Sequence, residues 1–241
     1  MKRSDSRSPK ERKSERRGAS PDPGPARAGR HGAQRKSTLR EWVEVVVVGL
    51  LVVSLFRGVV AQAYQIPSGS MENTLLVGDF LFINKMIYGP ELAPGIKGKN
   101  LFDIRFPAFR KPRPGDVIVF RYPVNPAVDY IKRCIATEGQ TLEIRNKVVY
   151  VDGKARREPF AVHSDPRMLP REAGPRDNFG PIVVPPGTIF MMGDNRDNSY
   201  DSRFWGPLPL REVKGKAMFL YLSWDGDRMM PRFERFFRPV R

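Results

Sequence analysis

The sequence predicts a mostly β domain with one apolar helix before it. From position 80 onward, short apolar runs with alternating patterns recur between Gly, Pro, Asn and Asp residues, which is typical of strands joined by tight turns. Helical periodicity is nearly absent from this part of the chain. A chain of 241 residues, 40% of them hydrophobic, has room for one medium-sized domain in addition to an N-terminal segment.

Residues 1–40 form a basic segment that we expect to be disordered. They contain 13 Lys or Arg against 4 Asp or Glu and few aliphatic residues, so they cannot bury enough apolar surface to offset chain entropy. Most of the net charge of +16 therefore lies in this tail. The charge favours a nucleic-acid-binding protein, but its uneven distribution argues against that class and we predict no nucleic-acid partner.

An apolar segment follows, and we predict a transmembrane anchor over residues 41–62. Its length approaches the roughly 20 residues that span a bilayer, provided that Glu44 and Arg57 lie near the two interfaces. Trp42 and Tyr64 lie where aromatic anchors occur. The alternatives are a buried strand or helix and the apolar part of a cleaved signal peptide. With the basic tail in the cytoplasm, the positive-inside rule places the rest of the chain outside.

The remaining chain is divided into a β core and an insertion. Runs of alternating or β-branched residues predict strands at 80–84, 116–121, 128–135, 141–145, 147–151, 188–192 and 216–222. Residues 152–186 hold seven prolines and few aliphatic residues, which is typical of a long loop, and 88–113 form a second such loop. We predict that the core comprises 63–145 and 187–241, and that 146–186 form an inserted second domain or loop.

Several kinds of chemistry are excluded by composition. The single cysteine, Cys134, cannot form an intramolecular disulfide or supply a metal site alone. Only His31 and His163 are available, which leaves little for a Ser-His-Asp triad or a histidine-rich metal centre. We expect no metal and no cofactor, and the base of any catalytic reaction must be a residue other than histidine.

Two stretches could supply a nucleophile and its base. In Pro67-Ser-Gly-Ser-Met71 a tight turn could present a hydroxyl beside free backbone N–H groups, as acyl transfer requires. In Asp129-Tyr-Ile-Lys-Arg133 the lysine alternates with apolar neighbours on a strand, where burial could lower its pKa until the neutral amine accepts a proton. Taken singly, the first stretch is better interpreted as an ordinary loop and the second as a strand with a solvated lysine.

Two further stretches complete the set. Gly193-Asp-Asn-Arg-Asp-Asn-Ser-Tyr-Asp-Ser-Arg-Phe-Trp-Gly206 is dense in side chains that hydrogen-bond to the backbone in turns. Arg113-Pro-Gly-Asp-Val-Ile-Val-Phe120 is a turn followed by a strand. Together and in this order, the four stretches resemble those of the bacterial type I signal peptidases (leader peptidases), which are membrane-anchored serine proteases with a Ser-Lys dyad.

This resemblance covers about 59–213 and implies a signal-peptidase-like β core with an inserted β-rich second domain, preceded by one transmembrane helix. It implies the nucleophile Ser70, the general base Lys132, an oxyanion-binding hydroxyl on Ser68, and Ser199 as the residue that orients the lysine. Asp201 and Arg203 match a supporting ion pair. The residues that match the lining of the shallow substrate pockets are Ile66, Pro67, Met71, Leu75, Tyr130 and Ile131.

The expected partners are secretory preproteins, cleaved after an Ala-x-Ala-like site, and the lipid bilayer; the oligomeric state is left open. The expected location is the bacterial cytoplasmic (inner) membrane, with a single pass, a cytoplasmic N-terminus and the catalytic domain on the outer face. A related Ser-Lys peptidase for another exported precursor, such as a pilus or conjugation protein, is the alternative. The chain departs from the family pattern at Asn73, where a proline is usual, and at 136–140, which affects loop shape and substrate preference.

Overall fold

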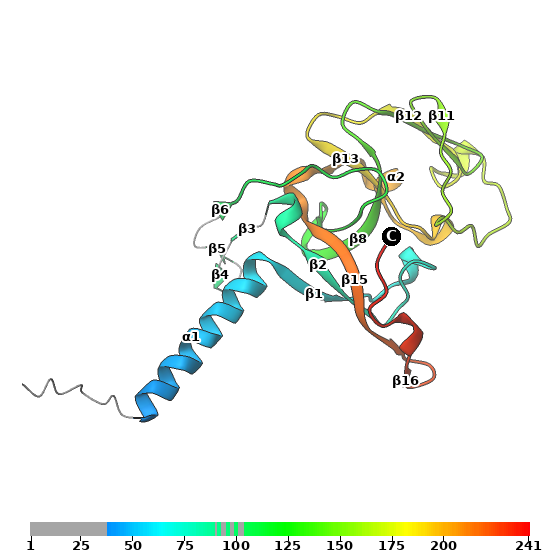
Figure 1. The fold of residues 1–241 in the computed structure, drawn as a ribbon. Helices are drawn as coiled ribbons and strands as arrows, with labels where there is room; N and C mark the ends of the chain where they lie inside the picture. The colour runs from blue at the N-terminus through cyan, green and yellow to red at the C-terminus, as the bar shows by residue number, and fades with distance from the viewer. Residues whose placement is uncertain (1–37, 90, 93–94, 97–98, 101–103) are drawn as a thin grey trace, which may run out of the picture. The chain divides into compact units, whose positions relative to one another are not determined.

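The structure is a computed structural model that describes residues 38–89, 91–92, 95–96, 99–100 and 104–241 (Figure 1). The chain divides into two compact units, Met1–Val43 and Glu44–Arg241. Only residues 38–43 of the first unit are described, so nearly all of the predicted basic tail lies outside the described residues.

The first element is helix α1, Thr38–Val59, which is followed by strand β1, Ala61–Gln65. The helix therefore begins and ends earlier than the predicted 41–62. The prediction is wrong at the C-terminal end because residues 61 and 62 pair with Asn84 and Ile83 of the next strand, so their backbone groups belong to a sheet. Among the residues that the structure describes, no helix is both long and apolar enough to cross a membrane.

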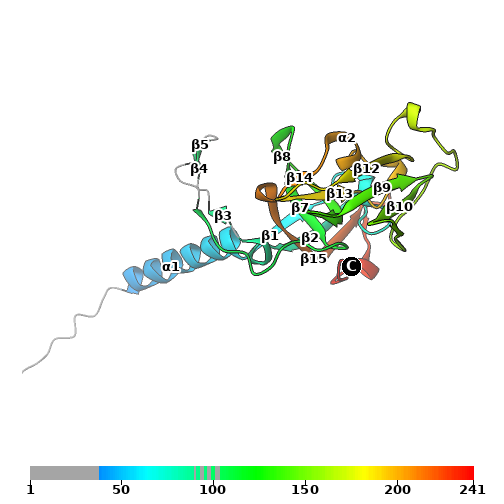
Figure 2. The ribbon, with the colours of Figure 1, turned by 90° about the horizontal axis from the view of Figure 1, so that it is seen from above.

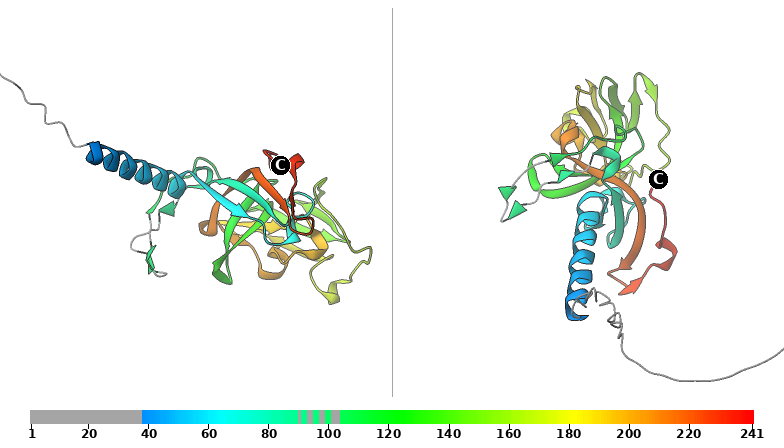
Figure 3. Two further views of the ribbon diagram at one scale, coloured as in Figure 1. Left: turned by 90° about the horizontal axis from the view of Figure 1, so that it is seen from below. Right: turned by 60° about the vertical axis from the view of Figure 1, so that its left-hand side comes forward.

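The main sheet confirms the mostly β prediction. Within the described residues its order is β1-β2-β15-β7-β8-β13-β14, with β16 paired to β15. The strand β15 is long and curved and pairs with both β2 and β7 (Figures 1 and 3). The bounds are β2 Asp79–Asn84, β7 Val117–Tyr122, β8 Asn125–Thr137, β13 Thr188–Met192, β14 Leu208–Pro209, β15 Val213–Asp225 and β16 Met230–Pro231.

A second sheet of four strands lies beside β13 in the ribbon (Figure 2). Its order is β11-β10-β9-β12, with β9 Thr141–Arg145, β10 Val148–Val151, β11 Lys154–Ala155 and β12 Phe179–Val183. The strand β9, which the prediction placed at the end of the core range 63–145, thus belongs to the inserted sheet, and β12 lies inside the predicted loop. A proline and a glycine hide β12 from alternation analysis, because neither is typical of strands.

Two short hairpins fall in the predicted loop 88–113. They pair β3, Glu91–Leu92, with β6, Ile104–Arg105, and β4, Gly95–Ile96, with β5, Lys99–Asn100.

The main sheet is covered on both faces. In β7, Val117 and Val119 pack into one buried cluster, while Ile118 and Phe120 pack into another, and this explains why β7 is a continuous apolar run. A third cluster joins β8 and β13 to the inserted sheet through Ile135, Ala136, Leu142, Ile144, Val149, Val151, Phe190 and Met192. The inserted sheet is therefore fixed to the strand that carries Lys132.

Candidate active site

A groove lies along a free edge of β8. Within the described residues, positions 129–132 of β8 pair with β7 and with no second strand, and β1 likewise pairs with β2 alone. Beside this edge of β8 lies a cavity of about 340 Å³ whose lining includes Pro67, Ser68, Ser70, Tyr130, Ile131 and Lys132. Residues far apart in sequence, which the sequence analysis selected as a nucleophile and a base, therefore meet in one groove.

Ser70 is held in a short helical turn directly after β1. The turn η1, Gly69–Met71, follows the extended residue Ser68, and the Leu75 N–H donates to the Met71 carbonyl at 2.8 Å. The loop after Ser70 is thus closed by backbone hydrogen bonds although Asn73 replaces the usual proline; the Glu72–Asn73 peptide bond is cis. Ser68 and Ser70 both reach the groove, whereas Met71 next to them is fully buried.

Lys132 projects from β8 toward Ser70, and its Nζ donates a hydrogen bond to Ser70 Oγ. The lysine is only 4% exposed, and the Tyr130 ring centroid lies 5.6 Å from its ammonium. Burial lowers the pKa of Lys132 from its ordinary 10.5 to about 8; the Asp201 and Asp194 carboxylates act against this, and the Arg203 guanidinium supports it. The neutral amine is therefore accessible near neutral pH.

Ser199 is also brought to the site, but without the predicted contact to Lys132. Its Oγ is buried and has no hydrogen-bond partner among the described residues. It lies beside Gly193, where a Cβ would overlap both Ser199 Oγ and the Ser70 carbonyl oxygen. The expected orienting hydrogen bond from Lys132 is therefore not seen in the described part of the chain, where the lysine ammonium donates to Ser70.

Position 193 requires a glycine because a Cβ there would overlap its neighbours. The sequence motif did not reveal this requirement. A glycine here has no unusual backbone angle, so only the space beside Ser70 calls for it. Asn195, two residues after Gly193, also supports the Ser70 loop through two hydrogen bonds. The Asn195 N–H donates to the Ser70 carbonyl at 3.2 Å, and Asn195 Nδ2 donates to the Gly69 carbonyl at 3.1 Å. These contacts cross more than a hundred positions and leave no pattern in the sequence.

Arg133 and Asp194 form a buried ion pair behind the site. Arg133 Nε and Nη2 donate to the two Asp194 carboxylate oxygens at 2.8 and 2.6 Å, with 1% and 0% of the side chains exposed. Asp194 also accepts from Thr74 Oγ1 at 2.5 Å. The pair therefore ties β8 to the loop after Ser70, and sequence reasoning assigned neither residue a role.

Asp201 and Arg203, selected as an ion pair, are paired and buried. Arg203 Nε and Nη2 donate to the Asp201 carboxylate at 2.9 and 2.8 Å, and Asp201 also accepts from the Gly193 N–H at 3.0 Å. Asp201 precedes the short helix α2, Ser202–Trp205, and accepts from the Arg203 N–H at its first turn. The pair thus holds the Gly193 backbone in place.

The residues expected to line substrate pockets separate into two groups. Pro67, Tyr130 and Ile131 line the groove. In contrast, Ile66, Met71 and Leu75 are 2% exposed or less and belong to the core cluster beneath it. Their side chains are packed in this cluster, and their role in lining substrate pockets stays a prediction.

Known proteins resemble this chain over most of its length. Residues 39–224 match the family described as signal peptidase, peptidase S26. The signal peptidase I of Pseudomonas aeruginosa is 34% identical, with 77% of this chain and 74% of that protein covered, and the signal peptidase I of Aquifex aeolicus is 34% identical, with 80% and 87% covered. A crystal structure of a signal peptidase I from Enterococcus faecalis is 29% identical, with a TM-score of 0.36 over 45% of this chain and 98% of that one.

Proposed function

Because the chain belongs to the signal peptidase family, peptidase S26, we propose that it removes signal peptides from secreted preproteins with Ser70 as nucleophile and Lys132 as general base. As a member of this family it is a peptidase, and therefore a hydrolase. The observation that carries the dyad is the hydrogen bond from Lys132 Nζ to Ser70 Oγ in a groove beside the free edge of β8. A lysine whose pKa is lowered by burial fits the role of a base.

In the proposed reaction, neutral Lys132 takes the Ser70 proton while Oγ attacks the carbonyl carbon of the scissile bond. The developing oxyanion accepts hydrogen bonds from the Ser70 N–H and the Ser68 hydroxyl. Protonated Lys132 then gives its proton to the leaving amine as the C–N bond breaks. Water, deprotonated by the same lysine, attacks the acyl-enzyme ester and releases the signal peptide and free Ser70.

The free edges of β1 and β8 support an extended substrate. A cleavage segment could pair its main chain with either edge, while its side chains meet Pro67, Tyr130 and Ile131. These rings and branched chains leave little room, so we expect small residues such as alanine at the cleavage site.

The proposal is tested with the full chain in detergent and a purified preprotein that has an Ala-x-Ala site. We expect cleavage after the second alanine, with the new N-terminus read by mass spectrometry, and little cleavage when that alanine is replaced by leucine. A Ser70→Ala preparation controls for contaminating peptidases. Cleavage at another bond, or equal cleavage by the Ser70→Ala preparation, contradicts the proposal.

Substitution of Ser68 by alanine is expected to weaken, but not abolish, cleavage. Loss of one oxyanion donor typically lowers kcat by about 10²- to 10³-fold, and the Ser70 N–H remains. The measurement is kcat and KM on the same preprotein, and we expect kcat to carry the loss. A Ser68→Ala variant with the kcat of the wild type excludes Ser68 as an oxyanion donor.

The rate should rise with pH through the pKa of Lys132. Because only the neutral amine acts as a base, kcat/KM should fall about tenfold per pH unit below about 8 and level off above it. The pH profile of kcat/KM is measured with thermal unfolding recorded over the same range, so that loss of folded protein is separated from protonation. A profile that is flat between about pH 6 and 9 contradicts a lysine base with this pKa.

We also propose that α1 attaches the protein to the bacterial cytoplasmic membrane, with the basic tail in the cytoplasm and the catalytic domain outside. Apolar side chains along α1 are about half or more exposed: Leu39, Trp42, Val43, Val45, Val46, Val47, Val48, Leu50, Leu51, Val52 and Val53. A continuous exposed apolar surface of this kind is typical of a contact with lipid or with another protein.

Attachment and orientation are tested separately. We expect the chain to stay in the membrane fraction after alkaline carbonate extraction. Because Cys134 is the single cysteine and is fully buried, cysteines introduced as Ser20→Cys and Lys154→Cys can be labelled against a low background. A membrane-impermeant maleimide should label the second variant in spheroplasts and the first only after lysis. Extraction by carbonate, or the opposite labelling, contradicts the proposal.

A further inference from the structure

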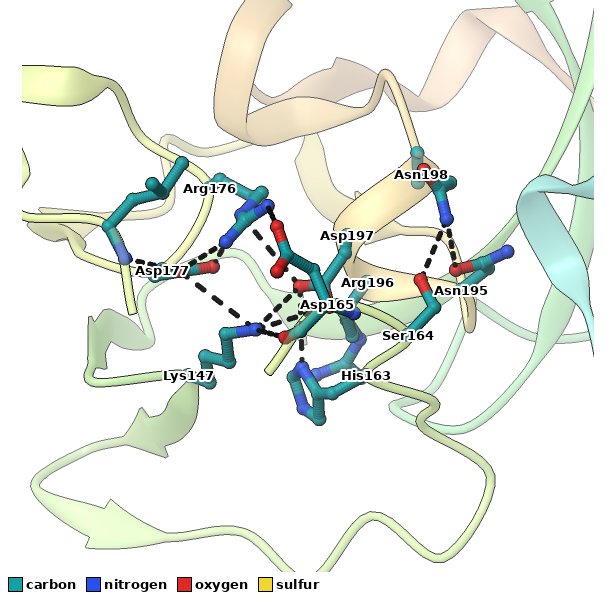
Figure 4. A network of polar contacts seen from close by, with 12 residues as sticks. Lys147, His163, Ser164, Asp165, Arg176, Asp177, Asn195, Arg196, Asp197 and Asn198 are labelled. Carbon is teal, nitrogen blue, oxygen red and sulfur yellow. Dashed lines mark hydrogen bonds and ion pairs between the residues drawn. The ribbon is translucent and has the colours of Figure 1, made fainter. Parts of the chain in front are cut away.

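A buried network of charges joins the inserted sheet to the segment behind Ser70 (Figure 4). At its centre Asp197, in the turn η4, Arg196–Asn198, is 2% exposed. Lys147 Nζ lies 3.1 Å from both Asp197 carboxylate oxygens, and the Asp165 N–H donates to Asp197 Oδ2 at 2.8 Å. His163 Nδ1 and Arg176 Nε lie 3.6 and 3.8 Å from Oδ1. Three other segments of the chain, at 147, 163–165 and 176, thus converge on one carboxylate.

Lys147 occupies a constrained position in this network. It is the second residue of the two-residue turn between β9 and β10, where Asn146 and Lys147 have φ of 50° and 69°. Its N–H donates to the Asp177 carbonyl at 2.8 Å, and its Nζ donates to the Asp165 carbonyl at 2.5 Å. With 10% of the side chain exposed, the ammonium is held on both sides and has little freedom to move.

Lys147 is one of the cations that compensate the carboxylates of this network. The carboxylates of Asp165, Asp177 and Asp197 face Arg176 and Lys147. Burial opposes ionisation of Asp197, but the Asp165 N–H and Lys147 keep its pKa below the ordinary value. Without Lys147, a carboxylate that is almost inaccessible to water would lose its closest cation.

The segment that Asp197 holds is the one that contacts the nucleophile. Asn195, two residues earlier, donates to the carbonyls of Gly69 and Ser70. Asn198, the next residue, lines the groove and donates to Ser164 Oγ at 2.8 Å and to Asn195 Oδ1 at 3.3 Å. Figure 4 shows Ser164, Asn195 and Asn198 next to the charged network. A displacement of Asp197 would therefore be passed on to the Ser70 loop and to the groove wall.

We propose that Lys147, in the inserted sheet, is a positioning residue for the Ser70–Lys132 reaction: by holding Asp197 it fixes the 193–199 segment against Ser70. This inference rests on the proposed function. It gives the inserted sheet a role in catalysis, since the β9–β10 turn supplies the lysine that lies 3.1 Å from the Asp197 carboxylate.

The test compares Lys147→Met, Lys147→Arg and Lys154→Met in the full chain in detergent, with a preprotein substrate. Lys154 is an exposed lysine of β11 in the same sheet, so its substitution makes the same change of charge. We expect Lys147→Met to lower kcat by about 10- to 100-fold, as displacement of catalytic groups does. Lys147→Arg should recover most of the loss, and Lys154→Met should stay within about twofold of the wild type, as substitutions remote from such features do.

The pH profile separates positioning from simple loss of folded protein. Thermal unfolding recorded over the same pH range distinguishes a change in its shape from a pH-dependent loss of folded protein. A loosened 193–199 segment would admit water to Lys132, and hydration would raise the pKa of the lysine toward its ordinary value. The rise of kcat/KM with pH should therefore occur at higher pH in Lys147→Met than in the wild type. An unchanged pH dependence with activity lost only in proportion to unfolded protein overturns the proposal. So does a wild-type kcat in Lys147→Met, or an equal loss in Lys154→Met.

A double variant covers the case in which Lys147→Met fails to fold. Lys147→Met with Asp197→Asn removes both charges and leaves no buried carboxylate unpaired, so folding should recover while the link stays broken. The proposal requires kcat to remain low in this variant, and a recovery of kcat overturns it. Failure of the proposed function has a different signature, because the wild type would then not cleave or Ser70→Ala would cleave as well.

Discussion

Substitution of either Ser70 or Lys132 is expected to abolish nearly all cleavage, by about 10⁴- to 10⁶-fold in kcat/KM. Ser70→Ala removes the nucleophile, and Lys132→Met removes the base while keeping a side chain of similar length in the buried position. The remaining rate reflects substrate binding and oxyanion stabilisation alone.

Because the two groups act as one unit, the double variant Ser70→Ala/Lys132→Met should be no slower than either single variant. Independent roles would instead make the losses multiply. The measurement is single-turnover cleavage of a preprotein at high enzyme concentration, with thermal unfolding as a check of folding. A Lys132→Met variant that retains a tenth of the activity would show that another group acts as the base.

The second large effect concerns stability. We expect Arg133→Met to lower the free energy of unfolding by about 3–5 kcal/mol, because it leaves Asp194 as a buried carboxylate without its cation. Arg133 also donates to the carbonyls of Gly115 and Arg241 at 2.9 and 3.0 Å, and its guanidinium lies 3.9 Å from the Phe160 ring centroid. These contacts add to the loss.

Denaturant unfolding of the full chain in detergent measures this effect. The double variant Arg133→Met/Asp194→Asn should regain part of the stability, since no unpaired charge then remains. The control is Lys111→Met, which breaks the exposed pair with Glu138 and should change the stability little. Equal losses for Arg133→Met and Lys111→Met would show that the buried pair has no special role.

The parts of the fold that could be predicted from sequence were those with local patterns. The strands β2, β7 and β13 follow directly from apolar runs bounded by turn residues, as does β9, although its sheet was assigned wrongly. In β15 the strand is longer than expected, because lysine and glycine interrupt the apolar pattern after Val213, and a serine interrupts it before Asp225. Pairing with β2, β7 and β16 determines its ends, and these partners lie far away in sequence.

The candidate site also contains residues that could be predicted from sequence and residues that could not. Ser70 and Lys132 were identified through the resemblance of their motifs, and the structure places their side chains in contact. The supporting contacts of Arg133, Asp194 and Asn195 depend on which surfaces meet after folding. A single sequence contains no local signal for such pairs, since each partner on its own reads as an ordinary strand or turn residue.

The pairing of β7 with β8 has a consequence for catalysis. Ile118 lies opposite Lys132, and Val117 lies opposite Arg133, so the two cations point to opposite faces of β8. A slip of one residue in register would exchange the faces, placing the Arg133 guanidinium beside Ser70 and the lysine beside Asp194. Arginine stays protonated in proteins and cannot act as a base. The chemistry therefore depends on strand register, and a fully paired sheet that is shifted by one position would contain both residues and still be inactive.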